Sequence, residues 1–194
     1  MKKRFLSAVL VLLAGLLTGC AHPIMISPSN AMHPQSANPI GKNVAYVMSD
    51  ADRSKEVITP GGGGDKISYY PYRDLEKAIR DALHVAYKDV TVVDKQGNLE
   101  VLKAHQVSYV FVPEITTTSE SPSLFTWPPT KFRIEMAVNV FDGAGQLVTQ
   151  IRTVGSGSAE FSEFKSNFGL AGNRAADDLE AKLVEEIKRN PKLQ

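Results

Sequence analysis

Lys131-Phe-Arg-Ile-Glu-Met-Ala-Val-Asn-Val-Phe-Asp142 alternates between polar and apolar residues over most of its length. A side-chain period of two is that of a β-strand with one buried face and one solvated face. The turn residues Asp142-Gly143-Ala144-Gly145 follow at once, and residues 146 to about 161 resume an extended pattern. The stretch therefore predicts a β-hairpin, which is the strongest β signal in the chain.

Further elements are expected on the N-terminal and C-terminal sides of this hairpin. The apolar, β-branched runs 43–48, 90–93 and 107–112 are typical of strands. Apolar residues recur at helical spacing over 73–87 and over about 173–189. The element order is thus β-α-β-β-β-β-α. We predict an α+β domain with a mostly antiparallel sheet of about five strands and two helices packed on one face.

The first twenty residues have the pattern of a lipoprotein signal. A basic Met1-Lys-Lys-Arg4 precedes an apolar run to Leu17 that is too short to span a bilayer. The run ends in Leu17-Thr18-Gly19-Cys20, which resembles the bacterial lipobox and its cleavage site before Cys20. This resemblance implies a covalent diacylglycerol and an N-acyl chain, such as palmitate, on Cys20. Cys20 is the only cysteine, so a disulfide is excluded, and no other cofactor is expected.

The residue after Cys20 also carries an expectation about location. It is Ala21, whereas an aspartate there marks inner-membrane retention in lipoproteins of enteric-type bacteria. By that resemblance we expect a protein anchored in the outer membrane and facing the periplasm.

The composition of the chain suggests four segments. Residues 1–19 are a signal peptide, 20–41 a lipidated cysteine and proline-rich tether, 42–190 a single α+β domain, and 191–194 a tail. A coil of roughly 20 residues spans about 25 Å, so the tether would let the domain stand off the membrane. His22 and His33, within the tether, are expected to have no role.

Apolar side chains in a polar loop supply the candidate partner surface. Leu124, Phe125 and Trp127 lie in the Pro/Ser-rich segment 119–129. Either this segment folds back to cap the core, or it is an exposed anchor for a protein partner, since aromatic residues dominate interface hot spots. The same two interpretations apply to Tyr69, Tyr70 and Tyr72.

No catalytic or metal-binding pattern is found in the sequence. The glycine run 61–64 is not followed by the Lys-Ser/Thr of a phosphate-binding loop, and it is expected to be a flexible loop. The glycines of 155–158 are expected to mark a β-bulge. The histidines lack zinc-ligand spacing, and a net charge of +1 argues against nucleic acid as a partner. We expect a non-enzyme without a metal.

The lipobox and the element order together resemble the small periplasm-facing lipoproteins of Gram-negative bacteria, nearest to the YajG-like lipoproteins. The penicillin-binding-protein activator lipoproteins and the lipoprotein of Pel exopolysaccharide export share the broad architecture. This resemblance implies a non-catalytic adaptor or assembly factor for an envelope complex that binds a protein partner. Two alternatives stay open: a self-associating ring or scaffold of an export system that uses its sheet edges, and a carrier of a small apolar ligand between sheet and helices.

Overall fold

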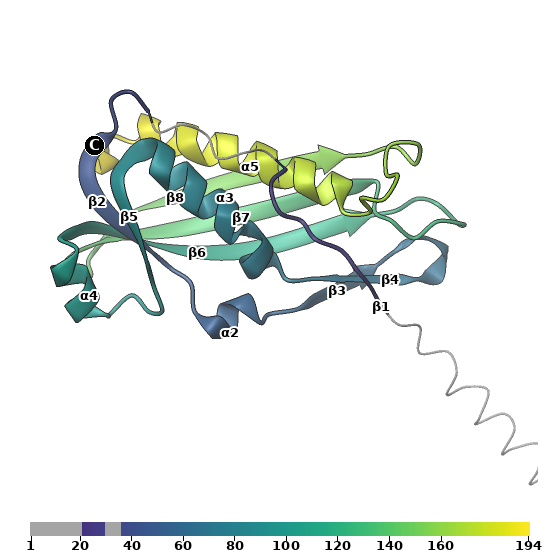
Figure 1. The fold of residues 1–194 in the computed structure, drawn as a ribbon, viewed down its shortest axis with the longest axis horizontal. Coiled ribbons are helices and arrows are strands. Elements are labelled where there is room, and N and C mark those ends of the chain that lie inside the picture. Colours follow the sequence, from purple (N-terminus) through teal and green to yellow (C-terminus); the bar gives the residue numbers. More distant parts are fainter. Residues whose placement is uncertain (1–20, 30–35) are drawn as a thin grey trace, which may run out of the picture.

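A central mixed sheet organises the chain (Figure 1). The computed structural model describes residues 21–29 and 36–194. Five strands lie in the spatial order β5-β2-β6-β7-β8; in chain order they are β2 (Ile40–Val47), β5 (Tyr87–Val93), β6 (Val107–Glu120), β7 (Lys131–Asp142) and β8 (Leu147–Ser158). The α+β class and the five-stranded sheet are therefore confirmed.

The strand directions correct one part of the prediction. β6, β7 and β8 form the expected antiparallel unit, but β2 pairs in parallel with both β5 and β6. The chain passes through α3 (Pro71–Ala86) between β2 and β5, and through α4 (Leu99–Ala104) between β5 and β6. Two parallel neighbouring strands start at the same end of the sheet, so the chain must cross back between them, and these helices provide that connection.

Two long helices cover one face of the sheet, as expected. α3 and α5 (Leu170–Arg189) pack against each other and against the sheet (Figure 1). The apolar stripe of α5 meets the alternating face of β7, on which Ile134, Met136 and Val138 are buried, while α3 packs on β2, β5 and β6. On the opposite face, α4 contributes Leu102 to a smaller apolar cluster with residues of β2, β5 and β6.

Helix α5 lies unusually close to β8 because β8 contains two glycines. A Cβ at Gly155 would lie 2.1 Å from the backbone oxygen of Ala175, and one at Gly157 would lie 2.1 Å from that of Ala171. β7 and β8 pair in register from Lys131 to Val140, and their irregularity falls at Val140/Phe141. The two glycines therefore allow α5 to pack closely on β8. Because the pairing is regular at 155–158, the expectation of a bulge there is wrong.

A second, three-stranded sheet was not predicted. It consists of β1 (Ala21–Pro23), β4 (Lys66–Tyr69) and β3 (Val57–Pro60), in the order β1-β4-β3. β1 runs parallel to β4, and β3 and β4 form a hairpin around the short helix η2 (Gly62–Gly64). The helix α2 (Asp50–Arg53) lies between β2 and β3 in the chain.

Residues 21–29 are part of the fold, so the tether expected over 20–41 is wrong there. Ile24 and Ile26 are buried in the main core, and the Asn173 amide of α5 donates to the carbonyl of Ser27 at 2.5 Å. The N–H and hydroxyl of Ser29 both donate to Asp177. Its prolines and polar residues are typical of a loop, and its packing partners lie far away in the sequence. The sequence alone therefore does not indicate that this segment is part of the fold.

The C-terminus is likewise packed rather than a free tail. Residues Pro191–Leu193 form the short helix η3, and the side chain of Leu193 is fully buried in the main core. The expected tail at 191–194 is therefore corrected. The described part of the chain contains no helix long and apolar enough to cross a membrane.

Candidate functional site

The expected site residues differ in their surroundings. Leu17, Thr18, Gly19 and Cys20 lie outside the described residues. Leu124 and Phe125 project from the β6–β7 loop, with 80% and 93% of their surface exposed.

Trp127, in the same loop, is half-buried. Its ring stacks on His22 at 4.2 Å between centroids and contacts the ring of Phe168 at 4.8 Å. The imidazole of His22 also lies 3.6 Å from the carboxylate of Asp65. The expectation that His22 has no role is therefore wrong. For Trp127, the interpretation that the loop folds back onto the core is the better one.

The tyrosines do not form a common surface. Tyr69 is fully buried, packs edge-on against Phe132 and hydrogen-bonds Thr117, so its proposed place on a partner surface is wrong. The ring of Tyr70 lies under the guanidinium of Arg73. Tyr72 accepts a hydrogen bond from the N–H of Ile115. Tyr69 is the last residue of β4, in which Ile67, Ser68 and Tyr69 are all buried, whereas Tyr70 and Tyr72 belong to the start of α3.

The four-glycine run supports the β6–β7 loop. Gly62 and Gly63 donate their N–H groups to the carbonyls of Trp127 at 3.2 Å and Ser123 at 3.0 Å. A Cβ at Gly62 would lie 2.0 Å from the carbonyl oxygen of Thr126, so only glycine fits there. Gly63 also has a positive φ of 68°. The glycine run is held in place by these contacts and supports the β6–β7 loop. The expectation that the run itself is a flexible loop is therefore wrong.

A local turn holds Phe125 outward. The hydroxyl of Ser123 accepts hydrogen bonds from the N–H groups of Phe125 and Thr126, at 3.1 and 3.0 Å. Such serine turns fix the backbone without help from the core. The exposure of Phe125 is therefore built into the loop.

Three segments bring exposed apolar side chains to this end of the molecule. Five of the nine large hydrophobic residues that are exposed among the described residues belong to residues 21–29, the β6–β7 loop and the β8–α5 loop. They are Met25, Leu124, Phe125, Phe161 and Phe168. The β6–β7 and β8–α5 loops and the start of β1 lie at the same end in Figure 1. We refer to these five residues as the apolar tip.

The β8–α5 loop is fixed by an ion pair. Arg174 donates to Glu163 at 2.8 Å and to the carbonyl of Ser158 at 2.7 Å. The hydrogen bond from Arg174, followed by one from the N–H of Glu160, lowers the pKa of Glu163 to about 2. This pair orients the loop that carries Phe161 and Phe168.

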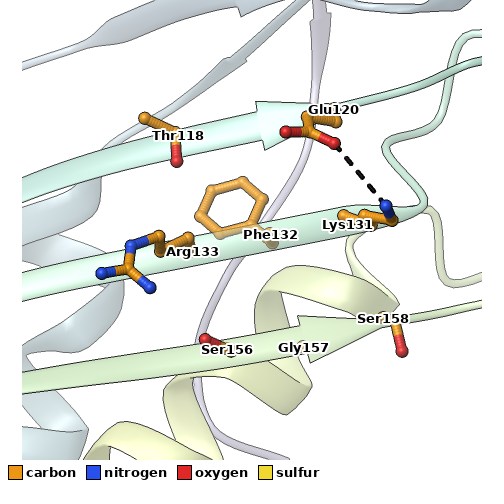
Figure 2. Close-up of a pocket in the computed structure, with 8 residues that line it drawn as sticks. All are labelled: Thr118, Glu120, Lys131, Phe132, Arg133, Ser156, Gly157 and Ser158. Atoms are coloured by element: carbon orange, nitrogen blue, oxygen red, sulfur yellow. Dashed lines mark ion pairs between the residues drawn. The ribbon is translucent and has the colours of Figure 1, made fainter.

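The side chains of β6–β8 that point away from α5 form a polar surface, which we call the open face. At its tip end lies a shallow depression of about 400 Å³, where residues that carry hydroxyl or charged groups expose mostly carbon atoms (Figure 2). Its lining residues are Thr118, Glu120, Lys131, Phe132, Arg133, Ser156, Gly157 and Ser158. Figure 2 shows Glu120 and Lys131 approaching each other across neighbouring strands, with 3.9 Å between nitrogen and oxygen.

The hydroxyl and charged groups around this depression can form hydrogen bonds with a partner. Serine and threonine hydroxyls both donate and accept, and the neighbouring charges have both signs. Among the described residues, no three His, Cys, Asp or Glu side chains group to hold a metal ion.

The free edge of the main sheet at β8 is occupied by side chains of the C-terminal segment. Lys182 donates to the carbonyl of Val154 at 2.9 Å, and Asp178 accepts from the N–H of Ser156 at 2.9 Å. Lys192 reaches the carbonyl of Val148 at 3.3 Å. An edge strand whose backbone groups are already paired offers fewer of them to another strand.

Comparisons with known proteins yield structural likenesses only. No family model and no curated protein matches the sequence. The fold is similar to protein XCC0632 from Xanthomonas campestris, of the family DUF330, with 12% identity over 86% of this chain and 93% of that one, at a TM-score of 0.47. A PelC dodecamer from Paraburkholderia phytofirmans gives 12% identity over 77% and 95%, at 0.39. A Caulobacter crescentus protein named provisionally as a lipoprotein gives 15% over 69% and 89%, at 0.30.

Proposed function

We propose that this chain is a lipoprotein anchored through Cys20 to the periplasmic face of the outer membrane, where it acts as a non-catalytic adaptor for an envelope complex. The signal pattern that ends in Leu17-Thr18-Gly19-Cys20, and the alanine at position 21, support the anchor and its location.

One structural observation carries the adaptor role: the residues directly after Cys20 are an integral strand of the fold. β1 starts at Ala21 and pairs with β4, and Ile24 and Ile26 enter the core. Acyl chains on Cys20 would therefore be attached directly to the folded domain rather than to a long flexible linker. A domain mounted in this way presents the same surfaces to its surroundings at all times, which suits the assembly of a complex.

The open face is the surface we assign to the protein partner. It runs along three long strands, and its exposed side chains, such as Arg133, Glu135 and Arg152, are polar or charged. Interfaces of non-obligate complexes have a comparable polar character. The depression in Figure 2 gives this face a concave point of contact.

The two alternatives from the sequence have less support. Pairing of subunits through β8 would have to displace the α5 side chains that occupy its edge. An apolar ligand between α5 and β8 has no space, because a Cβ at Gly155 would already lie 2.1 Å from Ala175.

Photo-crosslinking in cells tests the adaptor proposal. A photoreactive amino acid replaces Arg133 or Arg152 on the open face, and Glu185, exposed on the outer side of α5, is the matched control. We expect one discrete envelope protein as the adduct from the open face and none from position 185. Adducts of the chain with itself would favour the scaffold alternative, and equal labelling from all three positions would refute a defined partner surface.

A further inference from the structure

We propose that the apolar tip inserts into the interfacial region of the bilayer that holds the lipid anchor, so that the folded domain itself contacts the membrane. This inference rests on the proposed lipidation of Cys20, and it adds a second, non-covalent membrane contact to it. The occupant of the tip is thus a phospholipid surface rather than a protein.

The composition and exposure of the tip favour a lipid surface. Phe125 and Leu124 are 93% and 80% exposed, and Met25 is 60% exposed. These side chains lie on segments far apart in sequence that the fold brings to one end. Exposed apolar groups that converge in this way mark an interaction surface. Phenylalanine, leucine and tryptophan are the residues that peripheral proteins bury at the boundary between headgroups and acyl chains.

The position of the chain start identifies the occupant. Ala21 pairs with Lys66 beside the glycine run, and His22 stacks on Trp127 of the β6–β7 loop. Cys20 is bonded to Ala21, so acyl chains on it would leave the protein at the tip. Consecutive Cα atoms are only about 3.8 Å apart, and no slack intervenes between anchor and domain. The bilayer that receives the acyl chains is therefore the surface nearest to the tip.

The other exposed apolar residues supply an internal control. Leu147 is 60% exposed at the hairpin between β7 and β8, and Leu99 is 56% exposed on α4. Both lie at the opposite end of the sheet from the β6–β7 loop, and the 14 residues of β6 separate the two ends. At about 3.3 Å per residue this separation exceeds the thickness of a lipid headgroup layer several times.

The test measures depth in the membrane with spin labels. The full lipidated chain is placed in vesicles of phosphatidylethanolamine and phosphatidylglycerol, with Phe125→Cys as the probe and Leu147→Cys as the control. Because Cys20 is the only native cysteine, each variant offers one free thiol for labelling. We expect the ratio of oxygen to nickel-chelate accessibility to be several-fold higher at position 125 than at position 147.

Trp127 gives a second readout that needs no substitution. It is the only tryptophan, so brominated lipids should quench the fluorescence of this one side chain. Replacing Leu124 and Phe125 together with serine should reduce the quenching severalfold, whereas Leu147→Ser should leave it unchanged. All three side chains are solvent-exposed, so the core is not altered.

The outcomes separate this inference from the proposed function. If the protein is bound to vesicles but position 125 is as accessible to the nickel chelate as position 147, the tip proposal is wrong and the lipid anchor stands. If the chain does not bind vesicles, the anchor and the tip proposal both fail. A photo-crosslink from position 125 to a protein, with position 125 in water, would restore the partner interpretation of this loop.

Discussion

Gly155 and Gly157 define how the long helix sits on the sheet. A glycine within a strand lowers stability unless close packing requires it, because glycine loses more conformational freedom on folding than other residues. Here the backbone of α5 occupies the space in which a side chain would lie. The close approach also brings Asp178 and Lys182 within reach of the β8 edge.

Gly155→Ala should destabilise the fold by about 1–3 kcal/mol, because the added methyl group overpacks a backbone contact. Urea unfolding of the variant and of the native chain measures this difference. Gly97→Ala is the matched control, since a Cβ at Gly97 meets nothing within 4 Å. Equal unfolding midpoints for the two variants would show that α5 is not held at this distance.

Glu76 couples α2, α3 and β2 and gives the fold a dependence on pH. Its carboxylate accepts from the guanidinium of Arg53 at 2.8 and 2.7 Å and from the hydroxyl of Tyr46 at 3.1 Å. The hydrogen bonds from Arg53 are the main reason that its pKa lies below the usual value of 4.5. A carboxylate with a lowered pKa stabilises the folded state above pH 4.5 and loses that contribution as the pH falls through the folded-state pKa.

Glu76→Gln should therefore reduce the loss of stability on acidification below pH 4.5. The urea midpoint measured as a function of pH gives the slope for each protein. Glu185→Gln, on the exposed side of α5, is expected to keep the native slope. An unchanged slope in Glu76→Gln would mean that the ion pair with Arg53 does not persist in solution.

At the scale of elements, the N-terminal segment 21–29 is fastened to α5 by Asn173. Its side-chain nitrogen donates to the carbonyls of Ser27 at 2.5 Å and Met25 at 3.3 Å. Gly172 allows the close approach of Ile26 beside it. The segment is thus locked to the helix by polar and apolar contacts together.

Asn173→Ala should cost about 1–3 kcal/mol, because two buried or half-buried carbonyls lose their donor. Chemical denaturation of the full chain measures the loss, and limited proteolysis should cut within residues 21–29 faster than in the native protein. Glu185→Ala serves as the control on the same helix. Unaltered stability and unaltered cleavage would indicate that the segment is held without Asn173.

The elements differ in how far the sequence reveals them. The β7–β8 hairpin and both long helices follow from local periodicity, and the structure has them at nearly the expected residues. β1 could not be found in this way, because three residues with a proline pair with a strand more than forty positions away. The role of the glycine run could not be predicted either, because its N–H groups bind backbone carbonyls of the β6–β7 loop, which is distant in sequence.

At the scale of the whole molecule, the covered edge of β8 predicts a chain that does not associate through this edge of its sheet. Side chains of α5 pair with the backbone of Val154 and Ser156, and the charges they carry also oppose another strand. The apolar tip lies at the end of the molecule where the described chain begins at Ala21, and polar residues follow the open face away from it.

Replacing Asp178 and Lys182 with alanine should expose this edge and produce concentration-dependent self-association. Analytical ultracentrifugation of the full chain in detergent measures the molar mass of the variant. Lys188→Ala with Arg189→Ala removes two exposed charges from the same helix without touching β8 and should leave the mass unchanged. Identical masses for both double variants would argue that the α5 side chains do not protect the edge.

The central claim is that the residues directly after Cys20, the proposed lipid anchor, belong to the folded domain. Amide hydrogen exchange of the vesicle-bound, lipidated chain tests it at Ile24, whose N–H donates to the carbonyl of Ser68 at 2.9 Å. We predict that the peptide covering 21–29 is protected to the same degree as the first turns of α5, because the two unfold together. Exchange of that peptide at the rate of an unstructured chain would contradict the account and would restore a flexible tether between membrane and domain.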